Sequence, residues 1–467
     1  MDNRREPNER LRALIAEAGW TQEGLARAVN ALGGEIGDEL RYDRSAVAHW
    51  LTGTAPRPPV PQLIAEALSR RTGRTVTPRE AGFRAPGRSG SAAEGSRGDP
   101  ATSTPADGAP PEDTAPADTA AAPVDGIAAL REAATAPPGG LPLQRRPYRT
   151  AEARVPPGPS GGCGAPGPTP LPGPRVAALD GAVRSFAGAI DAHGGLRARE
   201  GLACCLAEEV APLLRAPMPH RERRRVLVSA GRLCLLLGRM YADALRHGAA
   251  QRCFTYAHQL ATEAGDRETW ATALRMMSAQ ARQLGHREHG LRLAEAAAGA
   301  VGTGAPGRRA YVLAQLAVMR AEYGERRDAL ESLSLAEHAV AEEEERAPGG
   351  PFDAYPAAAL SFQRSLVLEA LEDTPGAIAA LERSRTQRAP EDVRGLALSE
   401  ARLARLLLRS GRLDEACQAW HGFLDRHGRL DSGAARRELH EARRALRPYR
   451  GHRPAARLLA RAHQHTG

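Results

Sequence analysis

The chain of 467 residues contains no lysine, because all 64 of its basic residues are arginine. This absence excludes a Walker-A phosphate-binding loop and a Schiff-base lysine, each of which needs a lysine side chain. P-loop ATPases, pyridoxal enzymes and protein kinases of the usual type are therefore excluded. The formal net charge of +9 favours an acidic partner.

Cysteines and long apolar runs are also scarce. The six cysteines form no CxxC pair, which predicts small buried side chains in a reducing cytoplasm and no metal site. They are Cys163, Cys204, Cys205, Cys234, Cys253 and Cys417. No run of about 18 apolar residues occurs, so we expect no membrane span. The opening MDNRREPNER lacks the apolar core of a secretory signal.

Residues 85–173 are rich in Pro, Gly, Ala, Ser and Thr, as in GDPATSTPADGAPPEDTAPADTAAAP. This composition cannot bury enough apolar area to offset the conformational entropy lost on ordering. We expect a disordered linker that lets two domains, residues 1–84 and 174–467, move nearly independently. Within it, 125–134 is compatible with a transient helix, and RRPYR at 145–149 with contact to acidic surfaces.

The stretch from Asp43 to Gly53 predicts a short helix with two unlike faces. Asp43 is a good N-cap, because its carboxylate accepts from free N–H groups of the first turn, and Gly53 ends the helix. Helical periodicity gives one apolar face: Ala46, Val47, Trp50 and Leu51. The other face has no bulky aliphatic side chain: Arg44, Ser45, Ala48, His49 and Thr52. Such a helix fits a DNA major groove about 12 Å wide, although an ordinary surface helix shows the same pattern.

Three more short helices are predicted beside it. Thr21 caps one with an apolar stripe from Leu25 to Leu32, Asn8 caps another that ends at Gly19, and Pro59 opens the last. These four helices, with TQ-x-x-LA from Thr21 and S-x-V-x-x-W-L-x-G from Ser45, resemble the lambda-repressor-like (XRE-type) helix-turn-helix domain over residues 8–83. The resemblance implies double-stranded DNA as partner. Thr21 and Gln22 would meet the phosphate backbone, and Arg44, Ser45 and His49, with Thr52 on the same face, would point at base edges.

Two features depart from that family. Residues 31–42 separate the second and third helices, where the family has a tight turn, and would form a wing or tilt the reading helix away from the groove. Residues 1–84 also hold 13 arginines against 11 acidic residues, a balance of only +2. Because DNA affinity depends on neutralised phosphates, the domain alone should bind weakly and act as a dimer.

Residues 174–467 show helical periodicity arranged in pairs. The predicted pairs are 223–237 with 249–264, 268–284 with 286–300, 308–323 with 325–345, 354–371 with 375–385, and 391–410 with 413–427. Breaks fall near Gly238, Gly285, Gly324, Asp373 and Gly411. The pairs resemble tetratricopeptide repeats and predict an α-solenoid, capped by 176–214 and 431–465.

A stack of helix pairs has a concave face that binds peptides, proteins or a second copy of the chain. The first helix of each pair normally lines that face, which nominates Arg232, Arg239, Tyr241, Arg275, Gln280, Gln315, Arg320, Gln363 and Arg364 as partner-binding residues. The tail after Gly428 adds 10 arginines against 3 acidic residues, typical of an acidic partner or of a solvated helix face.

No motif predicts catalysis, and we expect neither a cofactor nor an enzyme. GTGAPG at 302–307 lies between helix pairs and is expected to be a loop, and Ser160 in GPSGG lies in the linker. His286 and His289 in HREH lack a third ligand, so a helix surface is favoured over zinc.

The sequence therefore predicts an all-α protein: a small helix-turn-helix bundle, a long disordered linker and a C-terminal α-solenoid. The combination resembles bacterial regulators with an XRE-type module followed by tetratricopeptide repeats, including a set from high-GC filamentous bacteria. This resemblance implies a cytoplasmic transcriptional regulator, expected to be a homodimer, whose repeats dimerise or bind a peptide or protein signal. The alternative is a repeat adaptor that uses the N-terminal bundle for protein contact.

Overall fold

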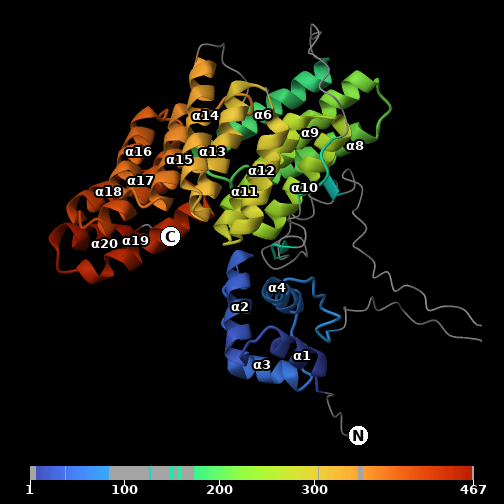
Figure 1. Cartoon of the computed structure of the whole chain (residues 1–467), viewed down its shortest axis with the longest axis vertical. Coiled ribbons are helices and arrows are strands. Elements are labelled where there is room, and N and C mark those ends of the chain that lie inside the picture. Colours follow the sequence, from blue (N-terminus) through green and yellow to red (C-terminus); the bar gives the residue numbers. More distant parts are fainter. Residues whose placement is uncertain are drawn as a thin grey trace, which may run out of the picture.

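The computed structural model describes residues 7–36, 38–83, 126–127, 147–150, 155–159, 173–302, 304–344 and 351–464. Across these ranges all regular elements are helices, as predicted. Figure 1 shows a small bundle of the N-terminal helices below a larger array of stacked helices. No helix in the described ranges has the length and apolar character needed to cross a membrane.

The N-terminal bundle contains α1 (Glu9–Glu17), α2 (Gln22–Glu35), α3 (Arg44–Leu51) and α4 (Val60–Thr72). The three predicted side-chain caps are confirmed: Asn8 accepts from Leu11 N at 3.0 Å, Thr21 from Gly24 N at 3.1 Å, and Asp43 from Ala46 N at 3.0 Å. The predicted apolar stripes meet in one buried core, which includes Leu11, Leu25, Val29, Val47, Trp50, Leu63, Ile64 and Leu68.

The array consists of five consecutive helix pairs. They are α9 (His220–Asp243) with α10 (His247–Ala264), α11 (Arg267–Gln283) with α12 (Arg287–Val301), α13 (Pro306–Tyr323) with α14 (Arg326–Glu344), α15 (Ala357–Ala370) with α16 (Thr374–Gln387), and α17 (Val393–Arg409) with α18 (Leu413–His427). The stacked pairs agree with the solenoid prediction. Breaks at Gly285, Gly324 and Gly411 are confirmed, where positive φ angles of 84°, 90° and 75° suit glycine.

Gly238 is not a break, in contrast to the prediction. It lies inside α9, and a Cβ atom at this position would sit 2.3 Å from Cε1 of Phe254 on α10. The lack of a side chain at Gly238 therefore lets α9 and α10 pack closely together. The chain reverses later, at residues 244–246.

Further helices flank the five pairs. Before them come α6 (Pro174–His193), α7 (Arg199–Cys205), the π-helical turn η2 (Leu206–Val210) and α8 (Ala211–Arg215). After them come α19 (Gly433–Leu446), the 3-10 turn η3 (Arg447–Tyr449) and α20 (Arg453–Gln464).

These flanking segments also touch one another, which the sequence did not predict. Asp431 N donates to His193 O at 2.8 Å, and Leu196 N donates to Asp431 O at 3.1 Å. The loop after α6 is thereby joined to the loop before α19, so the two ends of the array meet.

Most of the predicted linker lies outside the described residues, including Ser160, Cys163, Arg145 and Arg146. The described parts do not match the expectation of a freely moving linker. Ile127 is 0% exposed and Tyr148 is 1% exposed, because both side chains pack against the folded parts of the protein.

Candidate nucleic-acid interface

The two faces of α3 are divided as predicted. Val47, Trp50 and Leu51 are buried in the bundle core, whereas Arg44, Ser45, His49 and Thr52 are exposed. Figure 1 shows α3 at the end of the bundle away from the helical array. The polar face of α3 is therefore accessible within the described part of the chain.

Two contacts fix the position of α3. The ring of Tyr42, just before the cap, meets the ring of Trp50 edge-on, with 5.2 Å between centroids. At the other end, the Thr52 hydroxyl donates to His49 O at 3.0 Å. The Thr52 oxygen keeps acceptor capacity, while its single proton is used within the helix.

In its described residues, 36 and 38–43, the connection between α2 and α3 packs on α2 and does not project as a wing. Its first residues extend α2 to Glu35, and Ile36 after them is fully buried. The Asn30 side chain binds the backbone of the connection at Tyr42: its Nδ2 donates to Tyr42 O at 2.8 Å, and its Oδ1 accepts from Tyr42 N at 2.8 Å. A Cβ on Gly33 would lie 2.6 Å from Leu40 Cδ1, so this glycine admits the Leu40 side chain. The loop packs on α2 and leaves the polar face of α3 uncovered.

The residues assigned to phosphate contact lie at the start of α2. Thr21 is exposed and Gln22 is half-buried. Exposed arginines add positive charge to the bundle surface, namely Arg27, Arg41 and Arg57 together with Arg44. Exposed Glu23 and Glu39 offset part of it, which agrees with the small net charge of this region.

The side chains nominated for a concave binding face are mostly committed to internal contacts. Tyr241, Gln280, Gln315 and Gln363 are buried and do not line an accessible face, in contrast to the expectation. Gln280 donates to His247 O at 2.7 Å and Gln315 to Ser278 Oγ at 3.2 Å. These residues lie between helices of the stack, because the first helix of a pair contacts neighbours on several sides.

The nominated arginines are half-buried or paired. Arg232 and Arg239 form ion pairs with Asp353 at 3.4 Å and Asp191 at 3.3 Å. Arg275 lies over the Tyr311 ring at 4.0 Å, Arg320 donates to Ser332 at 2.9 Å, and Arg364 pairs with Glu337. Each of these arginines has an intramolecular partner, so an acidic ligand would have to displace it.

No group of three or more metal-ligating side chains occurs in the described ranges. The ring of His286, one of the two histidines of the HREH motif, stacks on the Tyr148 ring with 5.4 Å between centroids. Burial raises the pKa of the Cys234 thiol far above its usual range and that of Cys205 to about 11. Such thiols stay protonated and are poor nucleophiles or metal ligands.

Sequence reasoning missed Arg70 on α4. Its guanidinium forms a bidentate pair with Glu35 at 2.6 and 2.8 Å and also donates to Glu66 at 2.9 Å. Burial raises the pKa of Glu66, against the opposing effect of Arg70 and of a hydrogen bond from Thr150 N. The i,i+4 spacing of Glu66 and Arg70 on α4 is a sequence signal for their pairing. The contact of Arg70 with Glu35 joins α4 to α2, so helical periodicity gives no signal for it.

Comparison with known proteins bears on the bundle alone. Residues 11–84 are similar to the family described as SP15 N-terminal domain. The match covers less than a fifth of the chain, and the name of the family specifies no ligand or activity. No curated protein matches the chain.

Proposed function

We propose that this protein is a cytoplasmic, sequence-specific DNA-binding transcriptional regulator in which α3 enters the major groove. The supporting observation is the exposed polar face of α3, with Arg44, Ser45 and His49 outward and the apolar side in the core. An arginine can donate two hydrogen bonds to guanine, and a hydroxyl or imidazole can read a base edge. The absence of bulky aliphatic groups on this face permits close approach.

A dimer follows from the charge of the bundle. With a balance of only +2, one bundle neutralises few phosphates and binds weakly. Two bundles on one DNA molecule bind more tightly, because the second engagement is intramolecular. The helical array is the part proposed to dimerise the chain or to bind a peptide or protein signal.

The test is selection of DNA from a random duplex pool by the full chain, repeated at several salt concentrations. We expect enrichment of one motif and retention that falls steeply with salt. Arg44→Ala should then cost about 1–3 kcal/mol at one base pair of that motif. Gln22→Ala should weaken binding to all sequences about equally, as loss of a phosphate contact does.

A matched control is Arg327→Ala on α14, since this arginine is also exposed but belongs to the helical array. It should leave the selected motif and its affinity unchanged. Failure to enrich any sequence, or to retain DNA even at low salt, would contradict the proposal and favour a repeat adaptor whose bundle contacts protein.

A further inference from the structure

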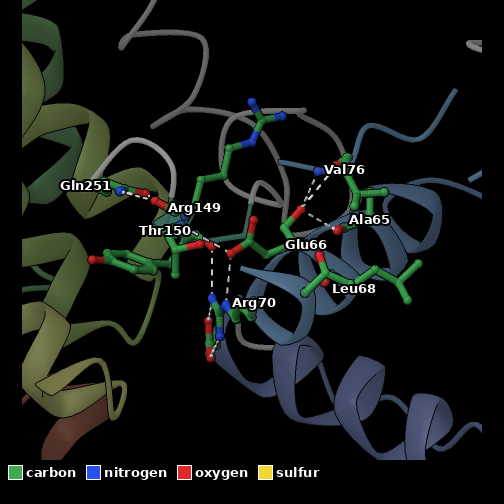
Figure 2. Close-up of polar contacts among 12 residues, drawn as sticks. Ala65, Glu66, Leu68, Arg70, Val76, Arg149, Thr150 and Gln251 are labelled. Carbon is green, nitrogen blue, oxygen red and sulfur yellow. Dashed lines mark hydrogen bonds and ion pairs between the residues drawn. The ribbon is translucent and has the colours of Figure 1, made fainter. Parts of the chain in front are cut away.

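A four-residue segment of the chain, Pro147–Thr150, lies between the bundle and the helical array. It is named the clasp segment below. Figure 2 shows Glu66 and Arg70 of α4 on one side of the segment and Gln251 of α10 on the other. Tyr148 within it is 1% exposed, although it comes from a stretch whose composition predicts disorder.

Side chains of the bundle and of the array form hydrogen bonds with successive backbone groups of the clasp segment. Gln251 accepts from Arg149 N and donates to Arg149 O, both at 2.8 Å. Arg70 donates to Tyr148 O at 2.9 Å, and Glu66 accepts from Thr150 N at 3.2 Å. Side chains thus satisfy every backbone polar group from Tyr148 O to Thr150 N. This is the pattern of a bound peptide whose backbone polar groups find their partners in the surrounding protein.

The Tyr148 ring supplies side-chain recognition. It stacks on the His286 ring, with an interplanar angle of 11°, and the Arg70 guanidinium carbon lies 5.8 Å from its centroid. His286 belongs to the array and Arg70 to the bundle, so each part contributes one contact to the same ring. A buried aromatic anchor flanked by backbone hydrogen bonds is typical of specific peptide recognition.

The Arg70 side chain is held by partners within the bundle as well as by the clasp segment. Glu35 and Glu66 both bind its guanidinium, and Gln251 on the other side is 1% exposed when the segment is in place. Arg246, just before α10, also pairs with Asp38 of the bundle at 3.9 Å. The two surfaces therefore carry complementary charge beside the peptide site.

We propose that α4, α10 and His286 at the start of α12 form a binding site for a peptide carrying a tyrosine, whose resident ligand is the clasp segment and whose occupation fastens the bundle to the array. This goes beyond the proposed function and does not depend on DNA binding. Occupation of the site sets where α3 points relative to the array. A free peptide with the same recognition features competes with the clasp segment and releases the bundle.

The first test is hydrogen exchange of the full chain, followed at the Arg149 and Thr150 amides. We expect both amides to exchange roughly tenfold or more slowly than an unstructured chain, because local opening is needed first. Gln251→Leu should abolish this protection while the amides of α4 stay protected. The control Arg74→Ala removes an ion pair between Arg74, just after α4, and Glu17 of α1, which lies within the bundle, and should leave the clasp segment protected. Exchange of both amides at the unstructured rate in the wild-type chain would overturn the proposal.

The second test uses the peptide RRPYRTA, residues 145–151, and a variant chain that carries Tyr148→Ala and Arg149→Pro. These substitutions lie outside the helices of both parts, so the helices should still fold. We expect calorimetry to show peptide binding to the variant and much weaker binding to the wild-type chain, since the tethered segment competes at about millimolar effective concentration. RRPARTA, which lacks the tyrosine, should not bind. Equal binding of the two peptides, or binding of neither to the variant, would contradict a peptide site.

Small-angle X-ray scattering of the same double variant tests whether the clasp segment holds the bundle against the array. Its radius of gyration should exceed that of the wild-type chain, whereas a chain with Thr104→Pro, elsewhere in the Pro-rich stretch, should match the wild type. An unchanged radius in the double variant would show that the clasp segment does not hold the bundle.

Discussion

Asp243, the last residue of α9, accepts a hydrogen bond from Arg394 Nε of α17 at 2.8 Å across 151 positions of sequence. Gly195 N and Ser432 Oγ also donate to this carboxylate, each at 2.9 Å. Burial by itself would raise the pKa of Asp243, but Arg394 and these hydrogen bonds hold it below its usual value. One carboxylate at the end of α9, in the first helix pair, thereby joins the segment after α6, α17 of the last helix pair and the start of α19.

Replacing this carboxylate should destabilise the array strongly. Asp243→Asn removes the buried carboxylate of the pair and leaves the half-buried Arg394 without its counter-ion. Breaking a fully buried pair typically costs about 3–5 kcal/mol, which sets the upper bound of the expected loss. Denaturant unfolding followed by circular dichroism measures the change. The control is Asp414→Asn, whose side chain is 72% exposed beside His452 and should change stability by less than about 1 kcal/mol. A loss for Asp243→Asn no larger than that of the control would contradict the closure of the array.

A pair of glycine substitutions tests the packing of α9 on α10. Gly238→Ala should destabilise the protein by about 1–3 kcal/mol, because its Cβ would overlap Phe254. Gly188→Ala in α6 has no atom within 4 Å of the new Cβ and should stabilise the protein by up to about 1 kcal/mol through helix propensity. Thermal melting of both variants should show shifts of opposite sign, and shifts of the same sign would refute this assignment of Gly238.

Asn30→Ala should loosen the connection before α3. The substitution removes both hydrogen bonds to the Tyr42 backbone, and leaving such half-buried groups unpaired costs about 1–3 kcal/mol. Asn30→Asp keeps an acceptor for Tyr42 N but sets a carboxylate oxygen against the Tyr42 carbonyl oxygen, so it should destabilise the connection as well. Faster amide exchange at Tyr42 in both variants than in the wild type is the expected readout. Equal exchange in all three chains would mean that Asn30 does not hold the loop.

Acidification should lower stability between about pH 6.5 and pH 4. Burial lowers the pKa of His247, His258 and His286 from 6.5 to about 4. Between these pH values the unfolded chain binds more protons than the folded chain. Each histidine therefore lowers the free energy of unfolding by up to about 1.4 kcal/mol for every unit by which the pH falls. Glu400 opposes this loss, because burial raises its pKa from 4.5 to about 7 and the folded state then binds the extra proton.

Melting temperatures between pH 7 and pH 5 test this balance. His258→Gln should reduce the fall in melting temperature, since one of the three buried histidines is removed. Glu400→Gln should steepen it, because the opposing proton uptake is lost. If both variants kept the wild-type profile, these side chains would not titrate as described.

The parts of the fold that were predictable are those that local chemistry determines. Asp43 and Thr21 bind amides three residues away, so their caps follow from sequence spacing, and helical periodicity alone places Val47 and Trp50 inward. The break at Gly285 likewise follows from a backbone that needs positive φ. Residue type and short spacing carry enough information for such features.

Contacts between distant segments were not predictable. Gln251 binds Arg149 across 102 positions, and neither residue belongs to a motif. Gly238 shows the same limit, since only the position of Phe254 distinguishes a close helix contact from a break. The candidate reading face was thus accessible to sequence reasoning, whereas the peptide site and the closure of the array required the structure.

The most direct test of DNA reading by α3 compares wild-type and His49→Ala chains on the selected DNA motif and all its single-base variants. We expect the substitution to flatten discrimination at one base pair, by about 1–3 kcal/mol, and to preserve it at the others. Unchanged discrimination at every position for both His49→Ala and Arg44→Ala would show that the exposed face of α3 does not read DNA.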